Sequence, residues 1–144
     1  MITEKTPKRA PYNLREKKEK NAAYRSLIRP AFADELYDKV LNIIVAQKKY
    51  KDPDYSAKKL AKELETNTRY LSAVVNSRFG MNYCCLVNEY RIKDALILLK
   101  DKRYADKNID EISDMVGFAN RQSFYAAFYK NVGITPKSYR KKYL

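Results

Sequence analysis

The sequence offers few side chains that could carry out covalent or metal chemistry. It contains two cysteines, Cys84 and Cys85, and no histidine among its 144 residues. Without histidine there is no imidazole base and no Ser-His-Asp triad, and two adjacent thiols supply too few ligands for a zinc site. We therefore expect no catalytic residue, no metal site and no cofactor, and a protein that is not an enzyme.

The glycines exclude the loops that hold nucleotides. Only Gly80, Gly117 and Gly133 are present, so neither a GxxxxGK[ST] nor a GxGxxG pattern occurs. A disulfide between Cys84 and Cys85 would be strained and incompatible with the helix expected there. We expect both cysteines to be thiols, and oxidation of the pair is the less favoured alternative.

The basic residues indicate binding. Lys and Arg number 30 against 17 Asp and Glu, a formal net charge of +13. Residues 1–30 carry +6 (9 basic, 3 acidic), 31–54 carry −1 (4 and 5), 55–105 carry +5 (10 and 5) and 106–144 carry +3 (7 and 4). This balance favours a polyanionic partner. A charge that only maintains solubility is the alternative, and charge alone does not distinguish DNA, RNA or an acidic membrane surface.

Composition predicts a helical protein. With 3 glycines and 5 prolines, the chain has about half the share of an average globular protein, which argues against turn-rich β folds. No stretch approaches the roughly 18 apolar residues of a membrane span. The polar and charged start of the chain lacks the apolar core of a signal peptide. We therefore expect a cytoplasmic protein with no membrane partner.

The first third of the chain predicts an arm and one helix. Residues 1–30 contain three prolines and a fully charged run at 15–20, which is typical of a basic flexible arm. Apolar residues at helical spacing predict a helix over 34–49, with Asp34 and Glu35 near its N-terminus, where acidic side chains stabilise a helix. Its expected buried residues are Leu36, Val40, Ile43 and Ile44.

A short helix, a turn and a longer helix occur twice, at about 56–80 and about 109–133. Ser56 is the expected N-cap of the first short helix, and Asn67 and Asn120 start the longer helices. Adding 53 to the inward residues Leu71, Val74, Val75 and Phe79 gives Phe124, Ala127, Phe128 and Val132. Such a unit is the plan of a helix-turn-helix, whose second helix reads DNA. A packed helical hairpin that binds nothing is the alternative.

One continuous helix, at about 83–99, is expected between the two units, because Ile92, Ala95, Leu96 and Leu99 share one face. Seventeen residues span roughly 25 Å. Major grooves on one face of DNA recur about every 34 Å, so this helix, with the lateral offset of the units, could hold two reading helices in successive grooves. We also expect Asn82 to be an N-cap, and Thr135 to cap a helix that begins at Pro136. The residues expected in the core are Leu99, Phe118, Phe124 and Phe128.

The C-terminal half carries a pattern known from bacterial regulators. It comprises Glu89-Tyr90-Arg91-Ile92 with Ala95 and Leu98-Leu99, then Gly117-Phe118-Ala119-Asn120-Arg121-Gln122-Ser123-Phe124 with Phe128, then Gly133-Ile134-Thr135-Pro136-Lys137-Ser138-Tyr139-Arg140. Over about residues 34–143 the chain resembles the DNA-binding domain of the AraC/XylS family of transcription regulators. The resemblance implies an all-α domain, residues 31–144, of about seven helices, with two helix-turn-helix subdomains joined by a long linker helix and bound to adjacent major grooves.

The resemblance also implies DNA-binding residues on the exposed faces of both longer helices. In the first helix these are Asn67, Thr68, Arg69, Ser72, Ala73 and Asn76. Arg69 is favoured for base readout, because a guanidinium can donate two hydrogen bonds to guanine, whereas Ser72 and Asn76 could equally contact phosphate or water.

In the second helix the matching residues are Asn120, Arg121, Gln122, Tyr125, Ala126 and Tyr129. Arg121 is favoured for guanine and Gln122 for adenine, while Tyr125 and Tyr129 could equally lie along the phosphates. Ala73 and Ala126 stand where many relatives carry longer polar side chains, so only small contacts, such as one to a thymine methyl, are expected there.

These observations predict a sequence-specific regulator of transcription that binds double-stranded DNA, associates with the nucleoid and has RNA polymerase as a candidate partner. The alternative is an architectural or accessory protein that bends DNA in recombination or mobile-element excision. We expect no small-molecule effector site. The arm could follow the DNA backbone or a minor groove, or serve as a linker. An RNA-binding module is disfavoured, because no aromatic sheet platform or KH-type loop is expected.

Overall fold

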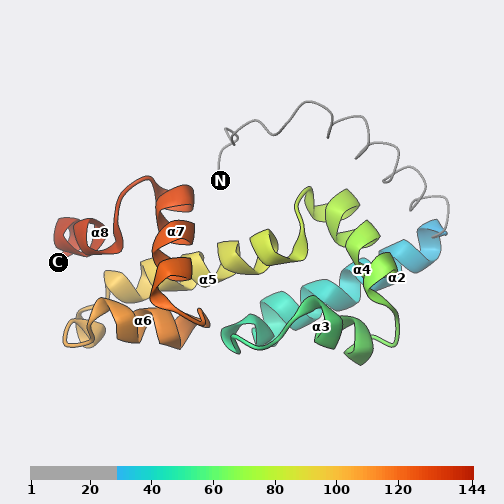
Figure 1. The fold of residues 1–144 in the computed structure, drawn as a ribbon, viewed down its shortest axis with the longest axis horizontal. Coiled ribbons are helices and arrows are strands. Elements are labelled where there is room, and N and C mark those ends of the chain that lie inside the picture. Colours follow the sequence, from blue (N-terminus) through green and yellow to red (C-terminus); the bar gives the residue numbers. More distant parts are fainter. Residues whose placement is uncertain (1–28) are drawn as a thin grey trace. The chain divides into compact units, whose positions relative to one another are not determined.

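The computed structural model describes residues 29–144, and every regular element in that range is helical. Its seven α-helices are α2 (Pro30–Leu41), α3 (Ala57–Glu63), α4 (Thr68–Val74), α5 (Tyr83–Leu99), α6 (Ile109–Val116), α7 (Arg121–Val132) and α8 (Pro136–Tyr143) (Figure 1). Short 3₁₀ turns occur at Lys49–Lys51 and Lys102–Tyr104, and π-helical turns at Asn42–Ala46 and Val75–Phe79 prolong α2 and α4. The expected all-α fold is confirmed. The arm, apart from its last two residues, lies outside the described residues.

The described residues form two compact units. The N-terminal unit comprises residues 29–47 and 56–86, and the C-terminal unit comprises 48–55 and 87–144. Helix α5 was expected at 83–99 and has these bounds, so its first turn belongs to one unit and the remainder to the other. Residues 48–55, which lie in the sequence between two segments of the N-terminal unit, belong to the C-terminal unit.

Helix α2 begins at Pro30, four residues before the expected start. Proline suits the first helical position because its missing N–H would have no partner there, and Arg29 before it has an extended backbone. Asp34 consequently lies in the second turn, and no acidic residue stabilises the first turn as the sequence had suggested. Its carboxylate instead lies 2.6 Å from the guanidinium of Arg78, which also stacks on the ring of Tyr37.

In the N-terminal unit, α2 packs on α4. Their contact is a cluster of three buried residues, Leu36, Ala73 and Val74. Phe32, Ala33, Tyr37, Leu64 and Tyr70 pack around this cluster. The expected inward residues of α2 and of its π-helical turn, Leu36, Val40, Ile43 and Ile44, are all buried.

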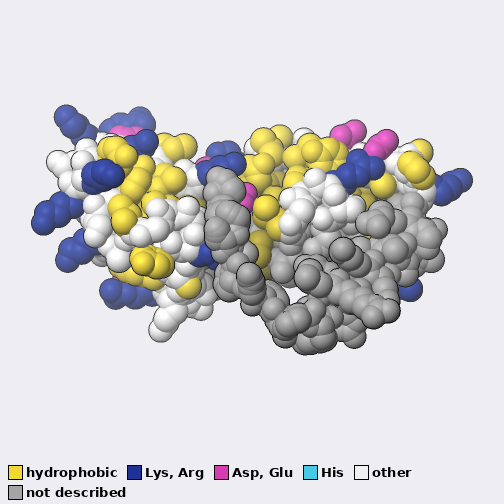
Figure 2. Space-filling model, turned by 90° about the horizontal axis from the view of Figure 1, so that it is seen from above, with side chains coloured by type: hydrophobic (Ala, Val, Ile, Leu, Met, Phe, Trp, Pro, Cys, Tyr) yellow, Lys and Arg dark blue, Asp and Glu magenta, His cyan; other side chains and the backbone are white. Residues whose placement is uncertain are grey.

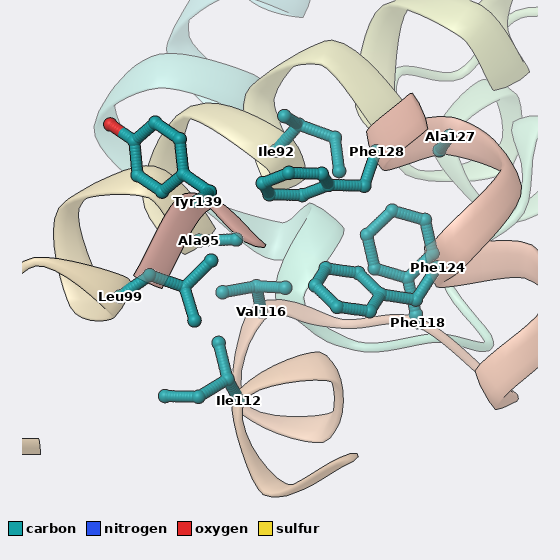
Figure 3. Packing of buried hydrophobic residues seen from close by; sticks show 10 residues of the cluster. All are labelled: Ile92, Ala95, Leu99, Ile112, Val116, Phe118, Phe124, Ala127, Phe128 and Tyr139. Carbon is teal, nitrogen blue, oxygen red and sulfur yellow. The ribbon is translucent and has the colours of Figure 1, made fainter. Parts of the chain in front are cut away.

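The core of the C-terminal unit is formed by four helices and the turn before α7 (Figure 3). It contains Ile92, Ala95, Leu99, Ile112, Val116, Phe118, Phe124, Ala127, Phe128 and Tyr139. Phe124 makes edge contacts with Phe118 and Phe128, whose ring centroids lie 5.2 and 5.7 Å away. The expected face of α5 is confirmed at Ile92, Ala95 and Leu99, whereas Leu96 is half-buried and packs against this core. The expected core phenylalanines are confirmed, and their packing leaves the opposite face of α7 exposed.

Residues 48–55 are fastened to the C-terminal unit through Tyr50, which is only 1% exposed. Its hydroxyl donates to Asp94 of α5 at 2.5 Å, and its carbonyl accepts from Nε of Arg91 at 2.8 Å. Burial, together with the hydrogen bond to the Asp94 carboxylate, raises the pKa of the Tyr50 hydroxyl above its usual value. The hydroxyl therefore remains protonated and continues to donate throughout the physiological pH range.

Candidate nucleic-acid interface

Both longer helices of the helix-turn-helix units begin at an asparagine cap. The side-chain oxygen of Asn67 accepts from the backbone N–H of Tyr70 at 2.9 Å, and that of Asn120 accepts from Ser123 at 2.8 Å. The two caps are as the sequence predicted. The oxygen of each carboxamide is already bonded to the backbone, so only its NH₂ group remains to contact DNA. An NH₂ donor can bind phosphate, whereas bidentate recognition of adenine needs the oxygen as well.

The outer face of α4 starts with an exposed arginine. Thr68, Arg69 and Ser72 are exposed, in the first turns of the helix, the part of a recognition helix that approaches base edges. Asn76 is half-buried, and its side-chain nitrogen donates to the carbonyl of Ser72 at 2.8 Å. Asn76 is thus folded back along the helix, which favours a phosphate or water contact over base readout.

Ala73 does not belong to this exposed face. It is 6% exposed and lies in the cluster formed with Leu36 of α2. The expected exposure of Ala73 is therefore wrong, and its contact with DNA stays an untested prediction. The cause of its burial is packing against α2, whose Leu36 belongs to the same buried cluster.

The outer face of α7 is wider. Arg121, Gln122, Ala126 and Tyr129 are exposed, and Tyr125 is half-buried. Tyr129 is 61% exposed, so most of its side chain faces solvent. Tyr125 makes an edge contact with Phe124 and packs against the core of the C-terminal unit.

Arg121 is held by two neighbours. Its guanidinium carbon lies 5.1 Å from the ring centroid of Tyr125, a cation–π distance. One of its terminal nitrogens lies 3.6 Å from a carboxylate oxygen of Asp110 on α6. The Arg121 side chain is 65% exposed despite these contacts, so its guanidinium has two neighbours and is still accessible to a ligand from solvent.

A shallow hollow surrounds Arg121 at the start of three helices, α6, α7 and α8. It is lined by Asn108, Ile109, Asp110, Arg121, Tyr125, Lys137 and Arg140. Sequence reasoning missed Asp110 and Lys137 as members of this site. The capping box formed by Asn108 and Glu111 was a signal that puts Asp110 in the first turn of α6, and the cap at Thr135 puts Lys137 in the first turn of α8.

The part of the surface that carries α7 and α8 is strongly basic. Figure 2 shows many Lys and Arg side chains around it, and Lys130, Lys137, Lys141 and Lys142 are all exposed. Such a concentration of ammonium groups attracts phosphates and makes binding depend on salt. Arg140, in contrast, is turned inward and donates to the carbonyls of Lys107 and Tyr104 at 2.6 and 3.0 Å, which secures the loop before α6.

Other kinds of site receive no support from residues 29–144. No cluster of His, Cys, Asp and Glu in this range could hold a metal ion. None of its helices is long and apolar enough to cross a membrane. Cys84 and Cys85 are thiols at the start of α5, where the side chain of Asn82 accepts from the backbone N–H of Cys85 and caps the helix as expected.

The fold and these two helical faces define a protein with a duplicated helix-turn-helix. Residues 60–142, more than half of the chain, match the family described as a helix-turn-helix domain. The chain belongs to this family, and its domain is of the AraC/XylS type. The resemblance stated from the sequence motifs is confirmed.

Two curated relatives from Bacillus subtilis are similar to parts of the chain. The uncharacterized HTH-type transcriptional regulator YtdP is 30% identical over 83 residues, which is 58% of this chain and 10% of the relative. The uncharacterized transcriptional regulatory protein YesN is 29% identical over 93 residues, 63% of this chain and 25% of the relative. The chain thus matches a quarter or less of the length of either relative.

Solved structures have a similar fold. The C-terminal domain of the two-component response regulator YesN from Fusobacterium nucleatum is 28% identical, with a TM-score of 0.62, and the match covers 75% of this chain and 97% of that one. A protein of unknown function from Listeria innocua is also 28% identical, with a TM-score of 0.65 and coverage of 74% and 96%. The C-terminal domain of AraT, a response regulator from Geobacillus stearothermophilus, shares the fold at 24% identity, a TM-score of 0.62 and coverage of 76% and 84%.

Proposed function

We propose that this chain binds double-stranded DNA with a sequence preference and regulates transcription, with α4 and α7 in successive major grooves. The observation that carries the proposal is the repeated unit. In each copy an asparagine caps a helix whose first turn carries an exposed arginine, Arg69 or Arg121. Recognition helices read base edges with their N-terminal residues, and arginine is the side chain best suited to guanine.

The names of the relatives support regulation as the role. YtdP and YesN are both named as regulators of transcription, which favours this role over the architectural alternative. Contact with RNA polymerase is one way in which a regulator bound beside a promoter changes transcription, so RNA polymerase, in the cytoplasm at the nucleoid, is the proposed partner. Transcription in vitro from a template that bears the bound motif tests this part of the proposal.

The first experiment is the selection of bound duplexes from a random pool, at about 150 mM salt with competitor DNA. We expect two short sequence blocks about one helical turn apart, one for each recognition helix. Arg121→Ala should weaken binding to the selected duplex by about 1 to 3 kcal/mol and relax the preference at a single position. Binding that is sensitive to salt but selects no motif would contradict the proposal.

A further inference from the structure

We propose that Asp110 is a specificity-determining residue that positions Arg121 for a guanine. This inference rests on the proposed function, because it concerns how one of the two recognition helices selects its base. Asp110 itself lies on α6, outside the recognition helix, and was not among the residues expected to contact DNA. Its carboxylate acts through the Arg121 guanidinium and not by a contact of its own with a base.

The first observation is the geometry around Arg121. A lone exposed arginine at the start of a helix would sample many rotamers, and ordering it on DNA would cost conformational entropy. Here the carboxylate of Asp110 lies on one side of the guanidinium, at 3.6 Å, and the ring of Tyr125 on another, at 5.1 Å. Together these contacts restrict the plane of the guanidinium before DNA arrives, which is the arrangement that favours one hydrogen-bonding direction.

The second observation is that the guanidinium has enough donors for both partners. It carries five N–H groups in a rigid plane. Two parallel donors meet O6 and N7 of guanine, and an N–H directed elsewhere stays available for the carboxylate. With 65% of the Arg121 side chain exposed, the ion pair does not close off the donors that a base requires. Asp110 can therefore remain in place while Arg121 binds.

The third observation is the sign of the charge. Asp110 lies in a hollow that also holds Arg121, Lys137 and Arg140, and its side chain is 55% exposed. A carboxylate among these cations reduces the attraction for every phosphate, whatever the sequence. Its expected effect is thus to weaken general binding while it improves the choice of base, which is how a residue that serves specificity differs from one that serves affinity.

Asp114 provides a matched control, because it lies one helical turn after Asp110 on α6 and is also exposed. Asp110→Asn and Asp114→Asn remove the same charge from the same helix. Both should strengthen binding to random duplex by a similar factor of about two to three, through the phosphates. Only Asp110→Asn should reduce the preference for guanine at the Arg121 position, by about fivefold or more.

The experiment measures the affinity of the full chain for the selected duplex and for the duplexes with each substitution at that guanine. It uses the wild type, both Asn variants, Arg121→Ala, and Asp110→Asn combined with Arg121→Ala. In the double variant, the loss of the carboxylate should have no further effect on base preference, because the residue that it positions is absent. Asp110→Glu, which keeps the carboxylate, should restore a large part of the preference.

Two outcomes would overturn the inference. Asp110→Asn could leave the guanine preference within twofold of that of Asp114→Asn, or it could lower the preference equally with and without Arg121. Because Asp110 also lies in the first turn of α6, where a negative charge stabilises the helix, thermal unfolding of each variant is measured alongside. A fall in melting temperature does not by itself change the preference at one base. If the wild type selects no motif, the proposed function fails instead.

Discussion

Gly117 and Gly133 both end a helix in the left-handed region, but they differ in what surrounds them. Gly117 has a φ of +110°, and a Cβ there would lie 2.8 Å from Cα of Lys51 and also against the carbonyl of Tyr50. Gly133 has a φ of +89° and nothing within 4 Å. In the N-terminal unit the corresponding turn is made by Glu65, whose φ of +58° is still open to a residue with a side chain. At position 117 glycine is required both by the larger φ of +110° and by the contact with residues 48–55.

We predict that Gly133→Ala lowers the free energy of unfolding by about 1 to 2 kcal/mol, the cost of the backbone conformation alone. Gly117→Ala should lower it by about 2 to 5 kcal/mol, because overpacking against the backbone of residues 50–51 is added to that cost. Urea unfolding followed by circular dichroism measures both values. Equal losses for the two variants would show that residues 48–55 are not packed on this turn.

Among the helices, α4 and α7 differ in how much of their outer face is open, because α2 packs on α4. Ala73 of α4 is buried in that contact, whereas Ala126 of α7 is exposed at the corresponding position. The packing face of α2 therefore narrows the readable face of α4 to its first two turns. The face of α7 extends further, to Tyr129. We expect the C-terminal unit to make the larger contribution to base readout.

This asymmetry is tested by the same substitution at both alanines. Ala73→Gln places a long polar side chain between α2 and α4, and we predict a loss of about 2 to 4 kcal/mol in the free energy of unfolding. Ala126→Gln should change stability by no more than about 0.5 kcal/mol, since it is exposed and glutamine is a good helix former. Thermal or urea unfolding distinguishes the two. A stable Ala73→Gln variant would mean that α2 leaves the face of α4 open.

The elements were predictable where their signals are local. Ser56, Asn67, Asn82, Asn120 and Thr135 were all expected to cap helices, and each accepts a hydrogen bond from a backbone N–H three residues later. A cap depends on a few neighbouring residues, so it can be recognised in the sequence. The expected periodic faces were confirmed for the same reason.

What the sequence did not predict depends on contacts between distant segments. Tyr50 is fastened to Asp94 and Arg91, about forty residues away, and no local pattern marks residues 48–55 as part of the C-terminal unit. The burial of Ala73 depends on α2, and the pairing of Arg121 with Asp110 depends on how α6 packs against α7. The helices that carry the candidate site could thus be predicted from periodicity. The burial and orientation of their side chains depend on tertiary packing and could not.

In the whole molecule, one helix runs from the N-terminal unit into the C-terminal unit. Helix α5 is continuous over 17 residues and contributes turns to both. A duplex that carries both sequence blocks should therefore bind more tightly than a duplex with one block. Once the first block is bound, the second is held near the other unit at a high effective concentration. That gain requires the second block to be on the face of the DNA that the second recognition helix can reach.

We predict that insertion of five base pairs between the two blocks lowers affinity at least about tenfold, to the level of a duplex with one block. Five base pairs turn the second block by about half a helical turn, because B-DNA repeats every 10 to 10.5 base pairs, and so move it to the opposite face of the duplex. Fluorescence anisotropy at fixed salt measures the affinities, and a duplex with the second block scrambled provides the single-block reference. Unchanged affinity after the insertion would show that the two recognition helices bind independently of the helix between them.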